Sequence, residues 1–321
     1  MEGWYQSSVL STIGWSLEKV NPLLDLAAEY KKCIEQKIDI GTKNRFSALT
    51  LFFEPSTRTR LSFESAAHHL GIKVMSVANA ANDTSAKKGE TLEDMGRMVS
   101  SYADVVIIRH PELGAARRLA SSATVPVINA GDGAGEHPTQ ALLDLFTIRE
   151  AFGTLKGLRV GLCGDLVNGR TIHSLLRLLV AFGCDIVAIS PEELAIPKEV
   201  LQKIPRAADA VRVEPDLRKV LAQLDVLYMT RVQKERFHDI EVYEKVKNAY
   251  RLTREDLDHA SDHLRILHPL PRVDEVAESV DGDPRARYFV QSANGVPTRM
   301  ALLTAILDIP NRVHAGMSGP D

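Results

Sequence analysis

The sequence predicts an α/β protein with two doubly wound domains, each built on a parallel sheet, and an active site in the cleft between them. Apolar runs typical of buried strands alternate with helical patterns, and this alternation comes as two successive series. A length of 321 residues is enough for two domains that each bury a core. Because ligands of such folds bind at the carboxyl ends of the strands, polar residues that follow strands are the candidates for chemistry.

The first series fills residues 1–150. In chain order, we expect a helix around 23–30, a strand at 46–53, a helix at 57–70, a strand at 72–77, a helix after Thr91, strands at 104–109 and 125–129, and a helix at 138–152. Gly71 is placed to end the second helix. One side of the helix after Thr91 is expected to be apolar, formed by Leu92, Met95, Met98, Val99 and Tyr102.

The second series fills residues 151–294. It is expected to contain strands at 158–165, 185–190, 226–229 and 265–268, with a helix at 171–182 after the first strand. A final apolar helix within residues 295–321 is expected to pack back onto the first domain. The sequence thus predicts two domains joined near residues 138–155.

Composition argues against several classes of function. The formal net charge is −3, with 45% hydrophobic and 25% charged residues, a balance that does not indicate a nucleic-acid-binding protein. No apolar stretch approaches the roughly 20 residues that cross a bilayer, and no secretory signal is visible. We therefore expect a cytoplasmic protein that binds neither nucleic acid nor membrane. Cys163 and Cys184 fall in strand-like runs, where small core residues are expected.

The strongest local signal is Phe53-Glu54-Pro55-Ser56-Thr57-Arg58-Thr59-Arg60, where a strand leads into a helix. Ser56 suits the N-cap position, which puts residues 57–59 in the first turn, where backbone N–H groups have no partner within the helix. Arg58 in that turn opposes the helix dipole unless an anion is bound. Hydroxyls, N–H groups and a guanidinium together predict a phosphate site, whereas an ordinary capped helix with solvated arginines is the alternative.

Ser56-Thr57-Arg58-Thr59-Arg60 resembles the phosphate-binding signature of the aspartate and ornithine carbamoyltransferases. Four more motifs follow in that family's order: Arg109-His110-Pro111, His137-Pro138-Thr139-Gln140, Asp165 to Arg170, and His268-Pro269-Leu270-Pro271-Arg272. The similarity runs from about Leu23 to Leu307 and so covers most of the chain. It implies an enzyme that transfers the carbamoyl group of carbamoyl phosphate to an amine, without a metal or a cofactor.

By this resemblance the first domain binds carbamoyl phosphate. The residues implied to hold its phosphate are Ser56, Thr57, Arg58 and Thr59. Arg109 and His137, with Thr59, are implied to hold its carbonyl oxygen, where attack by an amine builds negative charge. Taken alone, His137 would be a structural histidine that caps a helix. The groups implied to hold the NH2 group of carbamoyl phosphate are the Gln140 side chain and the backbone carbonyls of Leu270 and Pro271.

The second domain decides which amine is carbamoylated. Arg170 and Arg231 follow strands and suit a dicarboxylate, because each guanidinium can hold a carboxylate through paired hydrogen bonds. The resemblance implies that Arg170 holds the α-carboxylate of L-aspartate, and that Arg231 and Gln233 hold its side-chain carboxylate. The Ser-Met-Gly segment usual in ornithine enzymes is absent, and Pro269 replaces their cysteine. The implied product, N-carbamoyl-L-aspartate, belongs to an early step of de novo pyrimidine biosynthesis.

The polar segment from Asp83 to Thr91 reads on its own as a solvated loop. It resembles the family's mobile loop, from which Ser85 and Lys88 reach the active site of a neighbouring subunit. Lys88 is further implied to contact aspartate and to take part in catalysis. The segment is one residue shorter between Ser85 and the lysines than in some relatives. The resemblance implies a homotrimer with shared active sites, and the sequence leaves open whether regulatory chains join it.

Two more pairs of residues have a functional and a structural interpretation. The resemblance suggests that Glu54 bridges to Arg170 and Arg236 when the domains close, whereas otherwise Glu54 and Arg236 are unrelated surface charges. His259 and His263 have the i, i+4 spacing of a metal pair on a helix. No third ligand is apparent near them in the sequence, so a solvated helix face is expected.

Three other functions compete with this interpretation. Gly161-x-x-Gly164 after a strand invites a dehydrogenase interpretation, but its spacing is not G-x-G-x-x-G, and the next strand ends in Ser190-Pro191 rather than in an acidic residue. A non-catalytic assembly subunit would be expected to have lost the residues of the chemistry, and they are all present. A carbamoyltransferase that uses another amine acceptor is the strongest competitor.

Overall fold

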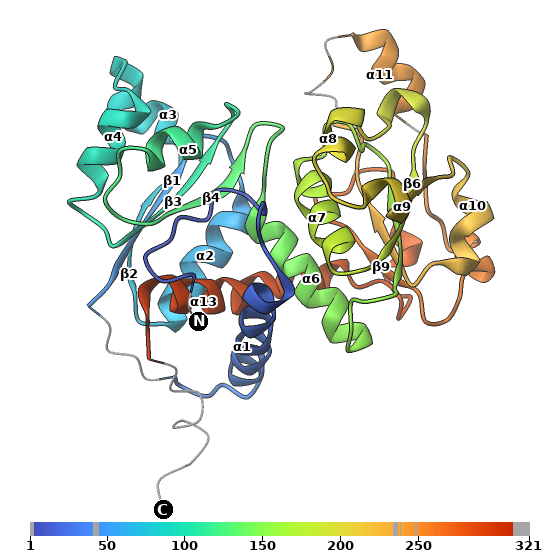
Figure 1. The fold of residues 1–321 in the computed structure, drawn as a ribbon, viewed down its shortest axis with the longest axis horizontal. Coiled ribbons are helices and arrows are strands. Elements are labelled where there is room, and N and C mark those ends of the chain that lie inside the picture. Colours follow the sequence, from blue (N-terminus) through green and yellow to red (C-terminus); the bar gives the residue numbers. More distant parts are fainter. Residues whose placement is uncertain (1–2, 41–44, 234–236, 238, 248, 311–321) are drawn as a thin grey trace, which may run out of the picture. The chain divides into compact units, whose positions relative to one another are not determined.

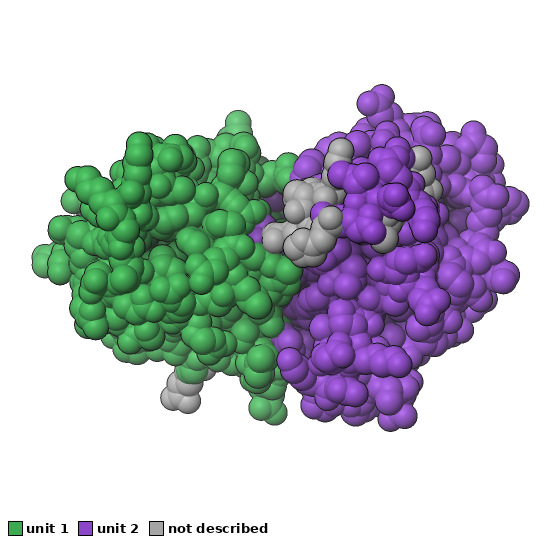
Figure 2. All heavy atoms as spheres, turned by 90° about the horizontal axis from the view of Figure 1, so that it is seen from above, with its two compact units in different colours: residues 1–146, 293–321 green, residues 147–292 purple. Residues whose placement is uncertain are grey.

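The computed structural model describes residues 3–40, 45–233, 237, 239–247 and 249–310. The chain forms two compact units, which are traced as a ribbon in Figure 1 and coloured separately in Figure 2. Unit 1 comprises residues 1–146 and 293–321, and unit 2 comprises residues 147–292. Both sheets are parallel throughout, which confirms the predicted fold class of two parallel-sheet α/β domains.

Unit 1 is built on a four-stranded sheet in the order β2-β1-β3-β4. Its elements are α1 (Leu17–Glu35), β1 (Ser47–Phe52), α2 (Thr57–His69), β2 (Lys73–Val77), α3 (Ala80–Asp83), η1 (Ser85–Lys88), α4 (Leu92–Val99), β3 (Val105–His110), α5 (Ala115–Ala120), β4 (Val127–Asp132), the start of α6 (Pro138–Phe152), and α13 (Gly295–Leu307). Helix α13 packs against both α1 and α2 (Figure 1). The central strands are apolar almost throughout because helices cover the sheet.

Unit 2 is built on a five-stranded sheet in the order β7-β6-β5-β8-β9. Its elements after α6 are β5 (Arg159–Cys163), α7 (Arg170–Ala181), β6 (Asp185–Ile189), η2 (Glu192–Leu194), α8 (Lys198–Gln202), α9 (Ala207–Ala210), β7 (Val211–Val213), α10 (Leu217–Val220), η3 (Leu221–Gln223), β8 (Val226–Met229), α11 (Ile240–Val246), η5 (Asp256–His259), β9 (Arg265–Leu267), η6 (Glu278–Val280) and α12 (Tyr288–Ala293). Cys163 and Cys184 are buried, which confirms them as core residues.

Strand order places a switch point in each unit. In unit 1 the chain adds β2 on one side of β1 and then β3 on the other, and in unit 2 it adds β6 and then β8 on the two sides of β5. Connections that leave the sheet on opposite faces open a crevice at the carboxyl ends of the two strands. Within each unit, residues that follow these strands are therefore placed to bind a ligand.

Some local expectations were wrong. Helix α4 ends at Val99, and the Met98 and Tyr102 side chains are 39% and 58% exposed, so neither belongs to its buried face. His259 and His263 do not share a helix: His259 ends the short helix η5, and His263 pairs with Asp225 at 2.9 Å. The edge strand β7 was not expected from the sequence, because it has three residues and none is buried. In the described residues, no helix is both long and apolar enough to cross a membrane.

Candidate active site

The candidate residues of unit 1 follow three neighbouring strands. Glu54 and Ser56 come directly after β1, Arg109 lies at the end of β3, and His137 follows β4. Strands β1 and β3 pair with Phe52 opposite Arg109, and the Phe53 N–H donates to the Arg109 carbonyl at 2.8 Å. The register therefore brings the carboxyl ends of the two strands together at the switch point of this sheet.

The first turn of α2 is free to receive an anion. Ser56 is the N-cap residue, yet its side chain forms no capping hydrogen bond. The turn carries no acidic residue, and the side chains of Thr57 and Arg58 are exposed while Thr59 is buried. No carboxylate in the described part of the chain forms an ion pair with the Arg58 guanidinium. A cation, three hydroxyls and N–H groups without a side-chain cap thus lie where the helix dipole is positive.

The Arg109 side chain is fixed in its place beside this turn. Its Nη2 lies 3.3 Å from Glu54 Oε1, and its Nη1 donates to the Ala130 carbonyl at 3.3 Å. The side chain is largely buried, so the ion pair is protected from solvent and salt. A guanidinium held by groups from β1 and β4 is preorganised to meet a negatively charged oxygen without reorientation.

His137 and Gln140 belong to the start of α6. The His137 carbonyl accepts hydrogen bonds from the N–H groups of Gln140 and Ala141, at 3.0 and 3.2 Å, so His137 stands at the N-terminal end of the helix. The His137 side chain is buried, and the Gln140 side chain is half-buried with its Nε2 donating to Asp144 Oδ1 at 2.9 Å. The helix thus sets both candidate side chains in its first turn.

Ser85 and Lys88 are set apart from the residues described so far. They open and close the short helix η1, and both side chains are exposed. Gly89 ends this helix with φ +91°, a left-handed conformation that suits glycine. Among the described residues, no carboxylate pairs with the Lys88 ammonium group. An exposed serine and an exposed lysine are available to a partner molecule rather than to the core of their own unit.

The candidate residues of unit 2 also follow neighbouring strands. Arg170 begins α7 after β5, Arg231 and Gln233 follow β8, and Leu270 follows β9. Buried Asp165 joins two of these segments, because its carboxylate accepts the N–H groups of Asn168 at 2.9 Å and of Gln233 at 3.2 Å. Gln233 Nε2 further donates to the Asn168 carbonyl at 3.3 Å. The segments that carry Arg170 and Gln233 are thereby tied together.

Burial raises the pKa of Asp165, while hydrogen bonds from the backbone of Asn168 and Gln233 oppose this effect. In the sequence, Asp165 stood out only as part of a motif, without a role of its own. In the structure its carboxylate joins the loops that follow β5 and β8. This role is visible only because the two strands are neighbours in the sheet. A carboxylate at the end of a buried strand was the available signal.

The segment after β9 is organised by a buried pair, His268 and Glu275. His268 Nδ1 accepts the Leu270 N–H at 2.8 Å, and its Nε2 lies 2.7 Å from Glu275 Oε1. Since Nδ1 is the acceptor, Nε2 carries the proton and donates it to the carboxylate. Burial alone would raise the pKa of Glu275, but the His268 contact and backbone N–H groups outweigh it and keep this pKa below its usual value. The pair fixes the backbone that carries the Leu270 and Pro271 carbonyls.

In each unit the described candidate residues follow the carboxyl ends of neighbouring strands, except that Ser85 and Lys88 lie on the exposed helix η1. Arg236 lies outside the described residues.

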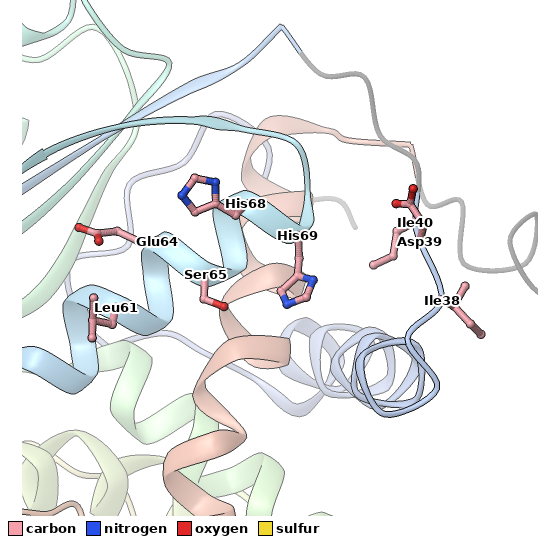
Figure 3. Close-up of a pocket in the computed structure, with 8 residues that line it drawn as sticks. All are labelled: Ile38, Asp39, Ile40, Leu61, Glu64, Ser65, His68 and His69. Carbon is pink, nitrogen blue, oxygen red and sulfur yellow. The ribbon is translucent and has the colours of Figure 1, made fainter.

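A pocket of about 680 Å³ elsewhere in unit 1 contains none of the candidates; it is lined by Ile38, Asp39, Ile40, Leu61, Glu64, Ser65, His68 and His69 (Figure 3). The rings of His68 and His69 point to different sides of α2. No group of three metal-binding side chains occurs among the residues that the structure describes.

Comparisons with known proteins agree with this arrangement. Residues 7–150 match the family of the carbamoyl-phosphate-binding domain of aspartate/ornithine carbamoyltransferases. Residues 156–306 match the Asp/Orn-binding domain of the same family. The chain is 47% identical over 306 residues to an aspartate carbamoyltransferase catalytic subunit of Thermococcus onnurineus, covering 95% of this chain and 98% of the relative. It is 49% identical over 308 residues to the catalytic subunit of Methanopyrus kandleri, covering 96% and 99%.

Solved structures give the same result. Aspartate transcarbamoylase from Trypanosoma cruzi in complex with N-(phosphonacetyl)-L-aspartic acid superposes with a TM-score of 0.89 at 36% identity, covering 96% of this chain and 98% of the other. The same enzyme in complex with carbamoyl phosphate and aspartate gives a TM-score of 0.88 at 36% identity, covering 95% and 98%. Two domain models that together span most of the sequence, and relatives that match nearly end to end, show that this chain belongs to the aspartate/ornithine carbamoyltransferase family.

Proposed function

We propose that this enzyme transfers the carbamoyl group of carbamoyl phosphate to the amino group of L-aspartate, giving N-carbamoyl-L-aspartate and phosphate. The observation that carries the proposal is the first turn of α2, where an exposed guanidinium without a carboxylate partner in the described chain stands beside uncapped N–H groups. Relatives named as aspartate carbamoyltransferases, and a solved relative that binds carbamoyl phosphate and aspartate, support the choice of substrates.

In this proposal the first turn of α2 holds the phosphate. Ser56, Thr57 and Thr59 donate hydroxyl and backbone hydrogen bonds, and Arg58 supplies a charge-assisted bond. These groups stabilise the phosphate as it leaves, because negative charge grows on its bridging oxygen in the transition state. The helix dipole adds to this effect, since the N-terminus of a helix is its positive end.

Arg109, His137 and Thr59 act on the carbonyl oxygen. The aspartate amine forms a C–N bond to the carbonyl carbon, and the carbonyl electron pair moves onto oxygen in a tetrahedral intermediate. When that pair returns, the C–O bond to phosphate breaks, and the departing phosphate takes the proton that the amine loses. The step therefore requires no side-chain nucleophile. Preorganised donors at such an oxyanion typically contribute a factor of about 10² to 10³ each.

The remaining candidates hold the carbamoyl NH2 group and the acceptor aspartate. Gln140 and the carbonyls of Leu270 and Pro271 accept hydrogen bonds from the carbamoyl NH2 group. The side chains assigned to aspartate are Arg170 on the α-carboxylate, Arg231 and Gln233 on the side-chain carboxylate, and Lys88. The Asp165 hydrogen bonds to Asn168 and Gln233 support this assignment, because they fix the two arginine-bearing segments relative to each other.

The exposed helix η1 supports a shared active site, in which Ser85 and Lys88 of one subunit complete the site of its neighbour. The family resemblance implies that the assembly is a homotrimer, and regulatory chains remain an additional option. Glu54 is assigned to domain closure, with Arg170 and Arg236 as partners. A cytoplasmic enzyme at an early step of de novo pyrimidine biosynthesis completes the proposal.

An acceptor panel tests the proposed reaction. Purified protein is incubated with carbamoyl phosphate and either L-aspartate, L-ornithine or putrescine, and the carbamoylated products are identified by mass spectrometry. We expect product from aspartate alone, because Arg231 repels the second ammonium group of ornithine and of putrescine. Arg231→Met should abolish aspartate carbamoylation while leaving carbamoyl phosphate binding intact. Product from ornithine or putrescine, but not from aspartate, would overturn the assignment of the acceptor.

A further inference from the structure

Two buried side chains of opposite charge, Asp144 and Arg299, interact electrostatically within unit 1. Asp144 of α6 is 0% exposed and Arg299 of α13 is 2% exposed. The Arg299 guanidinium lies 4.7 Å from the centre of the Phe63 ring in α2, and its Nη2 lies 3.4 Å from Thr139 Oγ1 in α6. One cation therefore contacts both helices whose first turns carry candidate residues.

The backbone beside Arg299 leaves room for its guanidinium. A Cβ atom at Gly295 would lie 2.4 Å from Arg299 Nη1, so glycine at that position leaves the space that the guanidinium occupies. Burial lowers the pKa of Arg299 to about 9, and the negative charge of Asp144 opposes this decrease. Arg299 is therefore still charged near neutral pH, and it places a positive charge in the surroundings of the Asp144 carboxylate.

Asp144 in turn fixes the orientation of a side-chain amide. Gln140 Nε2 donates to Asp144 Oδ1 at 2.9 Å. An ionised carboxylate can only accept hydrogen bonds, so Gln140 must turn its NH2 group toward Asp144 and its carbonyl oxygen away from it. The i, i+4 spacing on α6 places the two side chains one above the other on the same face of the helix.

We propose that Asp144 is a positioning residue: by accepting a hydrogen bond from Gln140 Nε2, it presents the Gln140 Oε1 atom as an acceptor for the NH2 group of carbamoyl phosphate. This inference rests on the proposed function, which assigns Gln140 to that NH2 group. Asp144 and Gln140 would thus determine which acyl phosphate the enzyme prefers. Acetyl phosphate has a methyl group in place of the NH2 group and gains nothing from a correctly oriented Gln140.

Asp144→Asn tests the proposal. The carbonyl of the introduced amide would turn toward Arg299, and its NH2 group would turn toward Gln140. This would reverse the Gln140 amide, so that the Gln140 NH2 group would face the carbamoyl NH2 group, two donors without an acceptor between them. The ratio of the acetyl phosphate Kd to the carbamoyl phosphate Kd, measured by calorimetry, should fall by roughly tenfold, the scale of one hydrogen bond. An unchanged ratio in folded Asp144→Asn would overturn the proposal.

Two controls separate positioning from a general loss of structure. Asp104→Asn removes a carboxylate at the opposite, amino-terminal end of β3, where Asp104 bonds the Ser47 N–H and hydroxyl, and it should leave the ratio unchanged. In a Gln140→Ala background the ratio should already be low, and adding Asp144→Asn should lower it no further. A further decrease in that background would overturn the role of Gln140 as the intermediary.

If Asp144→Asn does not fold, a measurement on the wild-type chain can still test the orientation of Gln140. The Gln140 side-chain NH2 signal, identified by its loss in Gln140→Ala, should keep a slowly exchanging proton in nuclear magnetic resonance spectra when carbamoyl phosphate is added. Loss of that protection on binding would contradict the proposed orientation. Failure of the proposed function can be told apart from failure of the positioning role. In that case the wild-type chain itself would bind no carbamoyl phosphate or form no carbamoyl aspartate.

Discussion

The carboxylate of Glu54 lies 3.3 Å from the guanidinium of Arg109 and links the residues that end two neighbouring parallel strands. The resemblance suggested other partners for Glu54, namely Arg170 and Arg236. The observed ion pair gives Glu54 a second way to act, through the orientation of Arg109. The two roles predict different kinetics, so they can be separated.

Glu54→Ala should raise the KM for aspartate by about tenfold or more, and change the carbamoyl phosphate Kd by less than about threefold, if Glu54 acts mainly in domain closure. The reason is that closure is needed to hold the second substrate, whereas carbamoyl phosphate is assigned mainly to unit 1. Steady-state kinetics and equilibrium binding measure the two effects. Equal losses for both substrates would mean that Glu54 acts through Arg109 instead.

Mixed assemblies test the shared active site. Lys88→Ala and Arg58→Ala chains should each be inactive alone, because each lacks a charge that the reaction needs. Subunit exchange between them should restore part of the activity, since some sites in a mixed trimer combine an intact Lys88 from one chain with an intact Arg58 from another. The readout is activity after dissociation and reassembly, together with the mass of the assembly. Confirmed mixed assemblies without recovery would refute composite sites.

A buried ion pair in unit 2 should control stability in acid. Arg285 donates to both oxygens of Asp283 at 2.8 Å, and these hydrogen bonds, against a smaller effect of burial, lower the pKa of Asp283 to about 2. The unfolded value is about 3.9, so the carboxylate contributes its full stability above about pH 4 and loses it as the pH falls toward 2. Asp283→Asn should lower the free energy of unfolding by about 3 kcal/mol at pH 7.

The difference between wild type and Asp283→Asn should shrink between about pH 4 and pH 2, as measured by urea unfolding at each pH. Glu244→Gln is the matched control, because the Glu244–Lys247 pair is exposed and should be worth less than about 1 kcal/mol. A pH-independent difference between wild type and Asp283→Asn would show that the lost stability comes from packing rather than from charge.

Gly164 at the end of β5 should tolerate no side chain. Its φ is +113°, and a Cβ atom there would lie 2.2 Å from the carbonyl oxygen of Thr230. Gly164→Ala should therefore destabilise the protein by at least about 3 kcal/mol, because β5 and β8 would have to separate. Gly282→Ala has open space and an ordinary φ, so its unfolding free energy should stay within about 0.5 kcal/mol of wild type. Similar thermal unfolding curves for both variants would contradict the steric argument.

Much of the architecture was readable in the sequence because it depends on local periodicity. The pattern predicted α6 at residues 138–152, where the structure has it, and predicted strands at the positions of β1, β3, β5 and β8. Short elements with weak patterns were less accessible. Helix α4 shows the limit: spacing alone put Met98 and Tyr102 on its apolar side, but Met98 is 39% exposed within the helix, and Tyr102 lies beyond its end at Val99.

The sequence by itself determined the fold class, the family and the residues that follow each strand, because strand ends and helix starts are encoded in neighbouring residues. Only the tertiary structure decided which distant groups meet. Arg299 lies 160 residues from Thr139 and yet contacts it, and Asp165 joins segments 68 residues apart. Such pairings depend on strand order and helix packing, which bring together positions that no local pattern links.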